Sequence, residues 1–505
     1  MPTTTPQVRS VPLAMSPEQF RDLGHRLVDQ LAGLLAAIPA GPVTPGETPA
    51  QVRAALALDG PLPEQGTDPG VLLERTTRQV FAHSLFNAHP KFMGYITASP
   101  APIAILADLV AAAANPNCGA FVLSPVATEI ERQSVRWIAE FIGLPGDCGG
   151  ILVSGGNMAN ITCFFAARAA HAGHDVRSEG IAARPGVMRV YTSAETHTWI
   201  QKAADLSGIG THAVRWIATD AHQRMDMDAL RRQVAADRAA GDRPFLVVGT
   251  GGSVSTGATD DLPALAAFCK QEGLWFHVDG AYGGFAAAVP GAPDTLRGLA
   301  LADSVAVDPH KWLYMPLEAG CALVRDAAQL RAAFAYHPVY YHMDEEYLNY
   351  VELGPQNSRG FRALKVWLAL QHAGAAGYRT MIGDDIRLSE RLAGNVRAHA
   401  DFEFCTQALS ITTFRYVPAD LRPGIGTPEV EAHLDALNRE LLDSSQKSGE
   451  AFVSNAVIAG RYLLRACIVN FNTEAADIDA LPAILARQGH AIDERLRPAA
   501  LRPAR

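Results

Sequence analysis

The stretch SVAVDPHKWL, residues 304–313, decides the fold of this chain. A short apolar run, Ser304–Val307, is followed at once by Asp308, His310 and Lys311. A lysine at the end of a buried strand is rare unless it is paired or takes part in covalent chemistry. A desolvated amine loses its proton more readily, which suits it to form a Schiff base. The alternative, a lysine whose amine simply reaches solvent, explains this setting less well.

A second apolar run ends in the same way. In HVDGAYGG, residues 277–284, Asp279 directly follows the run Leu274–Val278. A carboxylate at such a place is costly without a cationic partner, and the protonated nitrogen of a pyridine ring is one; the alternative is an aspartate that caps the next helix. An acid on the ring nitrogen and an amine on the aldehyde carbon are what pyridoxal phosphate (PLP) requires as an electron sink. Asp279 and Lys311 together therefore predict PLP as the cofactor.

Two further runs end in polar residues that suit the same cofactor. Ile151–Val153 leads into SGGNMAN, residues 154–160, where glycines at a strand-to-helix turn let backbone amides approach a phosphate; an ordinary tight turn is the alternative. Val187–Thr192 leads to His197, which can stack on a flat ring or simply cap a helix. Ligands of open α/β sheets bind beyond the carboxyl ends of the strands, so we expect these groups to meet at one edge of a sheet.

The order of the segments predicts the architecture. From about His89 onward, short β-prone runs alternate with alanine-rich helical stretches, which indicates an α/β fold with a mostly parallel central sheet and helices on both faces. Beyond about Gly383 the pattern becomes α+β, with strands expected at Ile411–Tyr416 and Leu463–Asn470. The motif SPEQ, residues 16–19, predicts the start of an N-terminal helix. We therefore expect an N-terminal helical segment at 1–88, a large PLP-binding domain at 89–382 and a small C-terminal domain at 383–505.

The composition argues against several classes of function. The 505 residues are 48% hydrophobic and 19% charged, which allows a large buried core. A net charge of -9 argues against a nucleic-acid surface and against docking on anionic lipid. The seven cysteines stand singly, as expected for reduced thiols in the cytosol. The N-terminus lacks the layout of a signal peptide and no stretch resembles a membrane span, so we expect a cytoplasmic protein; no metal site is predicted.

Taken in order, these motifs resemble those of the group II PLP-dependent decarboxylases. That family includes aromatic-L-amino-acid, histidine, glutamate and cysteine-sulfinate decarboxylases, and the resemblance spans roughly residues 16–475. It implies the fold-type-I PLP-dependent transferase fold. It also implies an obligate homodimer with active sites at the subunit interface, whose N-terminal helices wrap the partner chain. Further motifs that carry the resemblance are His89-Pro90 with Gly94-Tyr95, Ser124-Pro125 to Glu131, and the stretch RGFRALK at 359–365.

The resemblance assigns roles to individual residues. It implies that Lys311 forms the Schiff base, that Asp279 meets the pyridine nitrogen and that His197 stacks on the ring. Gly156 and Asn157 fall in the phosphate-binding turn. The full set of cofactor-binding residues that we predict is Gly156, Asn157, His197, Ser253, Asp279, Asp308, His310 and Lys311.

The segment Tyr336–Gly354 corresponds to the family's mobile catalytic loop. Counting back from Phe361 places Tyr350 at the position of the loop tyrosine that protonates the substrate α-carbon. A positioned acid in a closed site is what a carbanion needs after carbon dioxide has left. The loop also holds Tyr340, Tyr341 and Tyr347, and the donor could be any of the four.

The chain departs from the family pattern at two places. Val254 stands where the family commonly has a threonine that helps hold the cofactor, so Ser253 or Ser255 would have to replace it. The expected substrate pocket is also more polar than in aromatic decarboxylases. The residues that we expect to contact the substrate are Tyr95, Asn117, Leu317 and Arg465, of which Arg465 resembles an arginine that meets the substrate carboxylate in glutamate decarboxylases; Asn87, Ile96 and Gly119 are further altered positions.

We therefore predict decarboxylation of an L-amino acid to the amine and carbon dioxide, with an aromatic amino acid as the leading candidate substrate. Glutamate, aspartate or 2,4-diaminobutyrate are alternatives. An aldehyde-forming oxidative decarboxylase and an aminotransferase share the fold and remain alternatives. A PLP-binding regulatory protein without turnover is disfavoured, because Lys311, Asp279, His197 and Tyr350 are all present.

Overall fold

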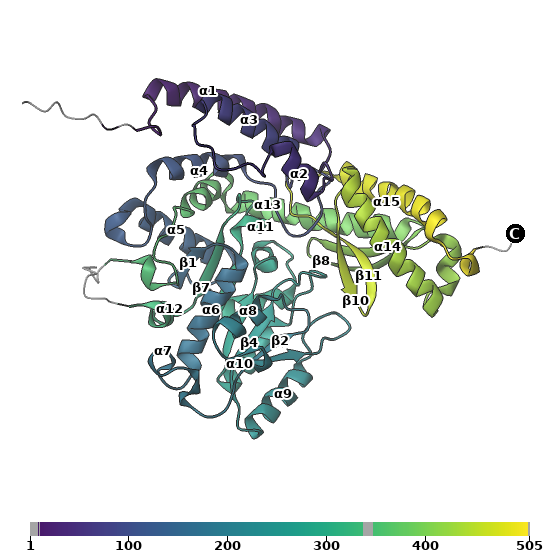
Figure 1. Ribbon diagram of the computed structural model, residues 1–505. Coiled ribbons are helices and arrows are strands. Elements are labelled where there is room, and N and C mark those ends of the chain that lie inside the picture. Colours follow the sequence, from purple (N-terminus) through teal and green to yellow (C-terminus); the bar gives the residue numbers. More distant parts are fainter. Residues whose placement is uncertain (1–8, 10, 337–346, 503–505) are drawn as a thin grey trace, which may run out of the picture.

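The central sheet of the protein has seven strands. The computed structural model describes residues 9, 11–336 and 347–502. The strands are β1 (Gly149–Val153), β2 (Met188–Ser193), β3 (Val214–Ile217), β4 (Arg243–Thr250), β5 (Trp275–Asp279), β6 (Ser304–Val307) and β7 (Gly320–Val324). Their order is β1-β7-β6-β5-β4-β2-β3; β1, β7, β4 and β2 are labelled in Figure 1. Neighbours among β2 to β6 are parallel, whereas β7 is antiparallel to both β1 and β6, so the predicted mostly parallel sheet is confirmed.

Helices cover both faces of this sheet, because alternate residues of a strand point to opposite sides. In β4, Leu246 and Val248 enter one apolar core and Val247 enters the other. The first core is closed by α6 (Gly156–His171), α8 (Trp199–Leu206) and α12 (Ala327–Phe334). The second is closed by α5 (Pro125–Phe141), α10 (Leu262–Glu272) and the first half of α13 (Ala363–Ala398). The remaining helices of this part are α7 (Val176–Glu179), α9 (Met227–Ala239) and the short α11 (Pro309–Trp312).

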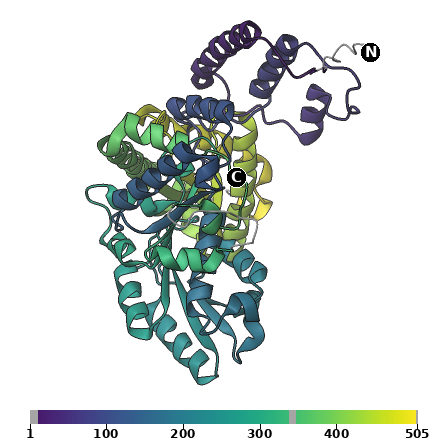
Figure 2. The same cartoon turned by 90° about the vertical axis from the view of Figure 1, so that its left-hand side faces the viewer.

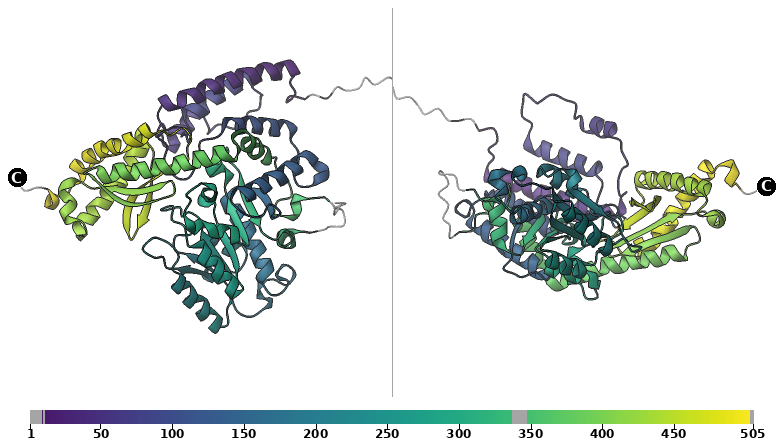
Figure 3. Two further views of the ribbon diagram at one scale, coloured as in Figure 1. Left: turned by 180° about the vertical axis from the view of Figure 1, so that it is seen from behind. Right: turned by 90° about the horizontal axis from the view of Figure 1, so that it is seen from below.

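A second sheet forms the C-terminal part, which lies beside the large domain at one end of the molecule in both views of Figure 3. It is antiparallel, with the order β10-β11-β9-β8. Its strands are β8 (Phe402–Ala408), β9 (Ile411–Tyr416), β10 (Ser454–Ile458) and β11 (Arg461–Cys467), and it packs against α14 (Pro428–Ser448) and α15 (Ala475–Leu496). The long helix α13 runs from the large sheet to this one and turns at Gly374, where φ is 65° and ψ is 166°. The domain boundary predicted at residue 383 therefore lies inside a helix that both parts share.

Most of the predicted strands are present, and three strands were missed. Ser304–Val307 and Ile411–Tyr416 have the bounds expected from the sequence. β3, β8 and β10 were not predicted, and each lies at the edge of its sheet. An edge strand buries less of its surface and needs a weaker apolar pattern, as the alternation of buried and exposed residues in β10 shows.

The N-terminal helices lie outside both sheets, as Figure 2 shows. α1 (Pro17–Ala37) begins with the predicted capping box: the Ser16 backbone N–H donates to Gln19 Oε1 at 2.9 Å, and the Gln19 backbone N–H donates to Ser16 Oγ at 3.2 Å. α2 (Pro49–Leu56) and α3 (Pro69–Ala82) follow, and α4 (Pro102–Ala114) joins this segment to the large domain. Among the described residues, no helix combines the length and apolar character that crossing a bilayer requires.

Candidate active site

The candidate site lies where β5 and β6 end side by side. The two strands are parallel, with Asp279 paired to Ala306, so the last residue of β5 lies beside the turn that leads from β6 to Lys311. Asp279 and Lys311 line the same cavity, and the convergence expected from the sequence is found. The other residues that line it come from the start of α6, the β2–α8 loop and the ends of β4, β5 and β6: Gly156, Asn157, Asn160, Glu195, His197, Thr250, Gly252, Val254, Ala281, Tyr282 and Asp308.

Lys311 is held by an ion pair one helical turn away. Its Nζ lies 3.0 Å from Asp308 Oδ2, and the Asp308 side chain is only 2% exposed. The other oxygen, Asp308 Oδ1, is buried and has no hydrogen-bond partner within the described residues. An unpaired buried carboxylate oxygen is costly, so its presence beside Lys311 indicates a site built for a polar ligand.

The beginning of α6 offers a place for a phosphate. Gly155, with φ +123°, turns the chain from β1 into α6, and no side chain caps this helix. A Cβ on Gly156 would lie 2.5 Å from Asp308 Oδ2, so only glycine allows this close approach. Backbone amides at a helix N-terminus attract anions. An amine, a carboxylate and an uncapped helix start thus surround one cavity, and these residues fit PLP.

The histidines predicted from the sequence lie around this cavity. His197 is at its rim, where Nδ1 accepts a hydrogen bond from the backbone N–H of Trp199 at 3.2 Å. His310 lies deeper, and its Nδ1 accepts from the Ala319 N–H at 3.1 Å. Burial lowers the pKa of His310, although Asp308 opposes that shift. In its neutral form His310 therefore carries its proton on Nε2, which lies 3.6 Å from Asp308 Oδ2.

Ser253, which was predicted to replace the missing threonine, is not among the residues that the structure describes as lining the cavity, and its contact with the cofactor remains a prediction. Its side chain is buried and its Oγ lies 2.9 Å from Thr256 Oγ1, so the hydroxyl is used within its own turn. Val254 lines the cavity instead, together with Thr250 at the end of β4. The sequence pattern located the turn but could not show which side chains face inward, because that depends on the twist of the chain after β4.

Arg465 is an unusual buried cation. It lies on β11, is 2% exposed, and its Nη1 donates to Ser454 Oγ at 2.8 Å and to the Tyr95 carbonyl at 3.3 Å. Its Nε and Nη2 have no partner in the described part of the chain. Burial raises the pKa of Tyr282, a residue of the cavity, and the charge of Arg465 opposes that shift. A buried guanidinium with two unused donors is a candidate anion site.

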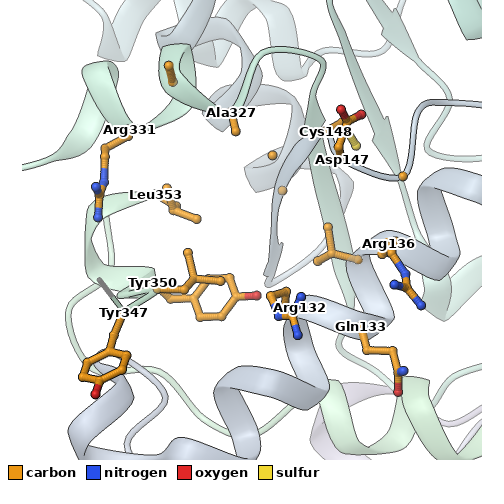
Figure 4. Close-up of a pocket in the computed structure, with 16 residues that line it drawn as sticks. Arg132, Gln133, Arg136, Asp147, Cys148, Ala327, Arg331, Tyr347, Tyr350 and Leu353 are labelled. Carbon is orange, nitrogen blue, oxygen red and sulfur yellow. The ribbon is translucent and has the colours of Figure 1, made fainter. Parts of the chain in front are cut away.

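Tyr350, the predicted acid of the site, is buried and lies outside the described lining of the Lys311 cavity. Tyr350 is 1% exposed, its ring lies 4.8 Å from the Arg359 guanidinium carbon, and burial raises the pKa of its hydroxyl. Figure 4 shows this hydroxyl pointing toward Arg132, in a second cavity that Tyr347 also lines. Within one subunit Tyr350 is therefore not part of the described lining of the Lys311 cavity, and its role as proton donor remains a prediction. Tyr340 and Tyr341 lie outside the described residues.

Three of the four predicted substrate contacts, Tyr95, Asn117 and Leu317, are exposed side chains. Tyr95 and Leu317 are 58% and 63% exposed. Asn117 is exposed too, although its Oδ1 accepts from the Gly119 and Arg359 backbone amides. None of these three side chains belongs to the described lining of the Lys311 cavity. Their roles in substrate binding remain predictions.

Sequence reasoning missed two side chains that contact Asp279. Trp199 Nε1 donates to Asp279 Oδ2 at 2.7 Å, and Asn160 Nδ2 donates to Asp279 Oδ1 at 3.2 Å. Asn160 was visible as the last residue of the SGGNMAN motif, and Trp199 lies two residues after His197. The position of each was available, but its contact with Asp279 depends on how α6 and α8 pack on the sheet.

Comparison with known proteins agrees with this geometry. Residues 51–417 match the model of the pyridoxal-dependent decarboxylase conserved domain. The chain is 32% identical over 471 residues to an aromatic-L-amino-acid decarboxylase of Bacillus atrophaeus, covering 92% of this chain and 94% of that protein. It is 28% identical to a phenylacetaldehyde synthase of a Rosa hybrid cultivar, over 92% of each chain. A crystal structure of Oryza sativa TDC with PLP and tryptamine superposes with a TM-score of 0.87 at 26% identity, over 97% of this chain and all of that one.

Proposed function

Because the chain belongs to the family of pyridoxal-dependent decarboxylases, we propose that it converts an aromatic L-amino acid to the corresponding amine and carbon dioxide. It is a PLP-dependent amino-acid decarboxylase with a fold-type-I architecture. The observation that carries the proposal is the single cavity lined by Lys311, Asp279 and the start of α6. The aromatic substrate class is supported by the relatives, of which the one from Bacillus atrophaeus is named for it.

Each residue of the cavity would contact a different part of the cofactor. When bound, PLP supplies the electron sink that stabilises the charge left on the substrate α-carbon. Lys311 provides the amine for the aldehyde carbon, and Asp308 keeps that amine in place. The amides of Gly156 and Asn157 would hold the phosphate, and Asp279 would meet the ring nitrogen; all three residues line the cavity. His197 at the rim can cover the face of the ring and exclude water.

A carbon dioxide release assay tests the substrate class. We expect release from tryptophan, tyrosine, phenylalanine or Dopa, and little from glutamate, aspartate or 2,4-diaminobutyrate. Release from the acidic or diamino substrates alone would contradict the proposal. The amine and the aldehyde must be measured in the same reaction, since one relative is an aldehyde synthase. Aldehyde with ammonia and peroxide, in place of amine, would favour oxidative decarboxylation.

Arg465 is proposed to hold the carboxylate of the substrate. Hydrogen bonds to a charged group contribute about 1.5–3 kcal/mol, so Arg465→Lys should raise the KM of the amino acid roughly ten- to a hundredfold. The inhibition constant of the product amine should change little, because the amine lacks the carboxylate. Steady-state kinetics with the amine as inhibitor measures both quantities.

The matched control is Arg461→Lys, on the same strand but half-exposed and paired with Glu403. It should leave both constants as in the unmodified enzyme. If Arg465→Lys weakened the amino acid and the amine equally, Arg465 would be supporting the site rather than binding the carboxylate.

Tyr350→Phe tests whether that residue is the proton donor. Its hydroxyl is buried away from Lys311, so we expect the variant to keep its turnover within about tenfold, whereas removal of a general acid costs about 10²–10⁴-fold. The measurement is the rate of amine formation together with any aldehyde. A loss of a hundredfold or more in the amine rate, with the fold intact by circular dichroism, would identify Tyr350 as the proton donor.

We also propose that the enzyme is a homodimer that works in the cytoplasm. No residue of α1 is buried, and α4 exposes Leu106, Leu109 and Val110 at 50%, 55% and 56%. Apolar surface of this extent on neighbouring helices marks a contact with another chain, and the family resemblance indicates a second copy. Free thiols at all seven cysteines suit a reducing compartment.

The double variant Leu106→Asp with Val110→Asp should weaken the dimer by about a hundredfold or more, because each charge must be desolvated at the interface. Sedimentation over a range of concentrations measures the change. Val457→Asp, at a valine that is 54% exposed on β10, is the control and should sediment like the unmodified chain. An unmodified chain that sediments as a 53.9 kDa monomer would refute the dimer.

A further inference from the structure

Asp279 is surrounded by hydrogen-bond donors. Its Oδ1 accepts from Asn160 Nδ2 and from the Ala281 backbone N–H, each at 3.2 Å, and its Oδ2 accepts from Trp199 Nε1 at 2.7 Å. An indole N–H and a backbone N–H can only donate. A protonated carboxyl group would need an acceptor for its own hydrogen, and these contacts offer none. The arrangement therefore selects the ionised form of Asp279.

The orientation of the Asn160 amide is fixed by its neighbours. Its Nδ2 lies 2.8 Å from the Gly156 carbonyl oxygen and also faces Asp279, and both partners only accept. The opposite end, Asn160 Oδ1, therefore faces His277 Nε2 at 2.7 Å, so Nε2 must carry a hydrogen. His277 thus donates to Asn160, and Asn160 donates to Asp279.

The hydrogen bond at the other ring nitrogen, His277 Nδ1, independently indicates that Nε2 carries the hydrogen. Trp275 Nε1 donates to Ser304 Oγ at 2.8 Å, which leaves the Ser304 hydroxyl hydrogen free for His277 Nδ1 at 2.9 Å. His277 is fully buried, and burial lowers its pKa to about 4, so the ring is neutral. Every hydrogen bond in the series Trp275, Ser304, His277, Asn160 and Asp279 therefore has a fixed direction. The series ends in a neutral N–H that donates to Asp279 and brings no positive charge.

We propose that Trp199, Asn160 and His277 are positioning residues that hold Asp279 ionised and aimed at the cofactor, and thereby keep the pyridine nitrogen of PLP protonated. The contacts of Asp279 described above are all neutral donors, so its negative charge is left for the ring. Trp199 also meets the edge of His277, with ring centroids 5.6 Å apart at 83°. The inference rests on the family function, since it requires PLP in this cavity. Among the described residues, the titratable side chains around Asp279 or lining the same cavity are Cys163, Glu195, His197, His277, Tyr282, Asp308 and Lys311.

The test uses enzyme loaded with PLP that carries ¹⁵N in the ring. Nitrogen NMR over a range of pH reports directly whether the ring nitrogen is protonated, and dialysis or fluorescence gives the cofactor Kd. In the unmodified enzyme the nitrogen should stay protonated. In Trp199→Phe and in Asn160→Leu it should lose its proton at a lower pH, and the Kd should rise about tenfold or more, as expected for loss of a hydrogen bond to a charged group.

Two controls distinguish an effect on the position of Asp279 from a general loss of structure in the cavity. Trp367→Phe removes another indole N–H, which donates to Gln133 Oε1 at 2.7 Å outside the site, and should match the unmodified enzyme. His277→Gln keeps a donor toward Asn160 and should rescue the nitrogen signal that His277→Leu loses. Trp199→Phe keeps an aromatic side chain and removes its N–H. It therefore still tests the hydrogen bond to Asp279 if one of the larger changes prevents folding.

The outcomes are distinct. An unchanged ring-nitrogen titration and an unchanged Kd in Trp199→Phe and Asn160→Leu would overturn the inference while leaving the decarboxylase function intact. Failure of the unmodified chain to bind PLP at all would instead refute the function on which the inference rests. Weaker binding with an unchanged titration would show that these residues only support the fold of the cavity.

Discussion

Lys311→Ala is expected to lower carbon dioxide release by at least about a thousandfold, because the variant lacks the amine that holds the cofactor covalently and moves protons at the reacting carbon. The side chain is only 19% exposed and its Nζ contacts Asp308, and among the described residues Lys311 is the one lysine that lines the cavity. The visible absorbance of the bound cofactor should change at the same time, which gives a readout that does not depend on turnover.

The control for this variant is Lys270→Ala, at an exposed position near the end of α10. It removes the same side chain without touching the cavity and should keep both activity and absorbance. Turnover of Lys311→Ala within tenfold of the unmodified enzyme would reject the assignment of the lysine.

Asp279→Asn should have the second largest effect, a loss of about 10²–10³-fold in kcat, the range found when one preorganised electrostatic contact is removed. The substitution keeps the shape of the side chain and removes its charge. It also places an amide NH₂ among donors, since Asn160 and Ala281 face one oxygen and Trp199 faces the other. Cofactor binding should weaken together with kcat, which titration of the apoenzyme with PLP measures.

Asp279→Glu retains the charge at a shifted position and should lose less activity than Asp279→Asn. Asp261→Asn is the matched control, because Asp261 caps α10 on the surface and asparagine caps a helix equally well. Equal losses in the two variants of Asp279 would show that geometry matters there and that the charge does not.

The sequence was sufficient for the parts of the site that follow strand ends. Each of Asp279, Lys311 and His197 comes just after an apolar run, and parallel neighbours bring such ends to one edge of the sheet. Tyr350 was instead assigned by counting along a loop. A loop has no period that fixes where its side chains point, so only the structure shows that the Tyr350 ring packs against Arg359.

Local sequence patterns by themselves determined the alternating α/β plan, the lysine–aspartate pair and the capping box that starts α1. They did so because strand period, helix caps and burial of charge are properties of short segments. Only the tertiary structure decided that Trp199, Asn160 and His277 converge on Asp279, and that the buried Arg465 of the second sheet has two donors without a partner among the described residues. Those contacts join residues far apart in the chain, and their geometry depends on how whole helices and sheets pack together.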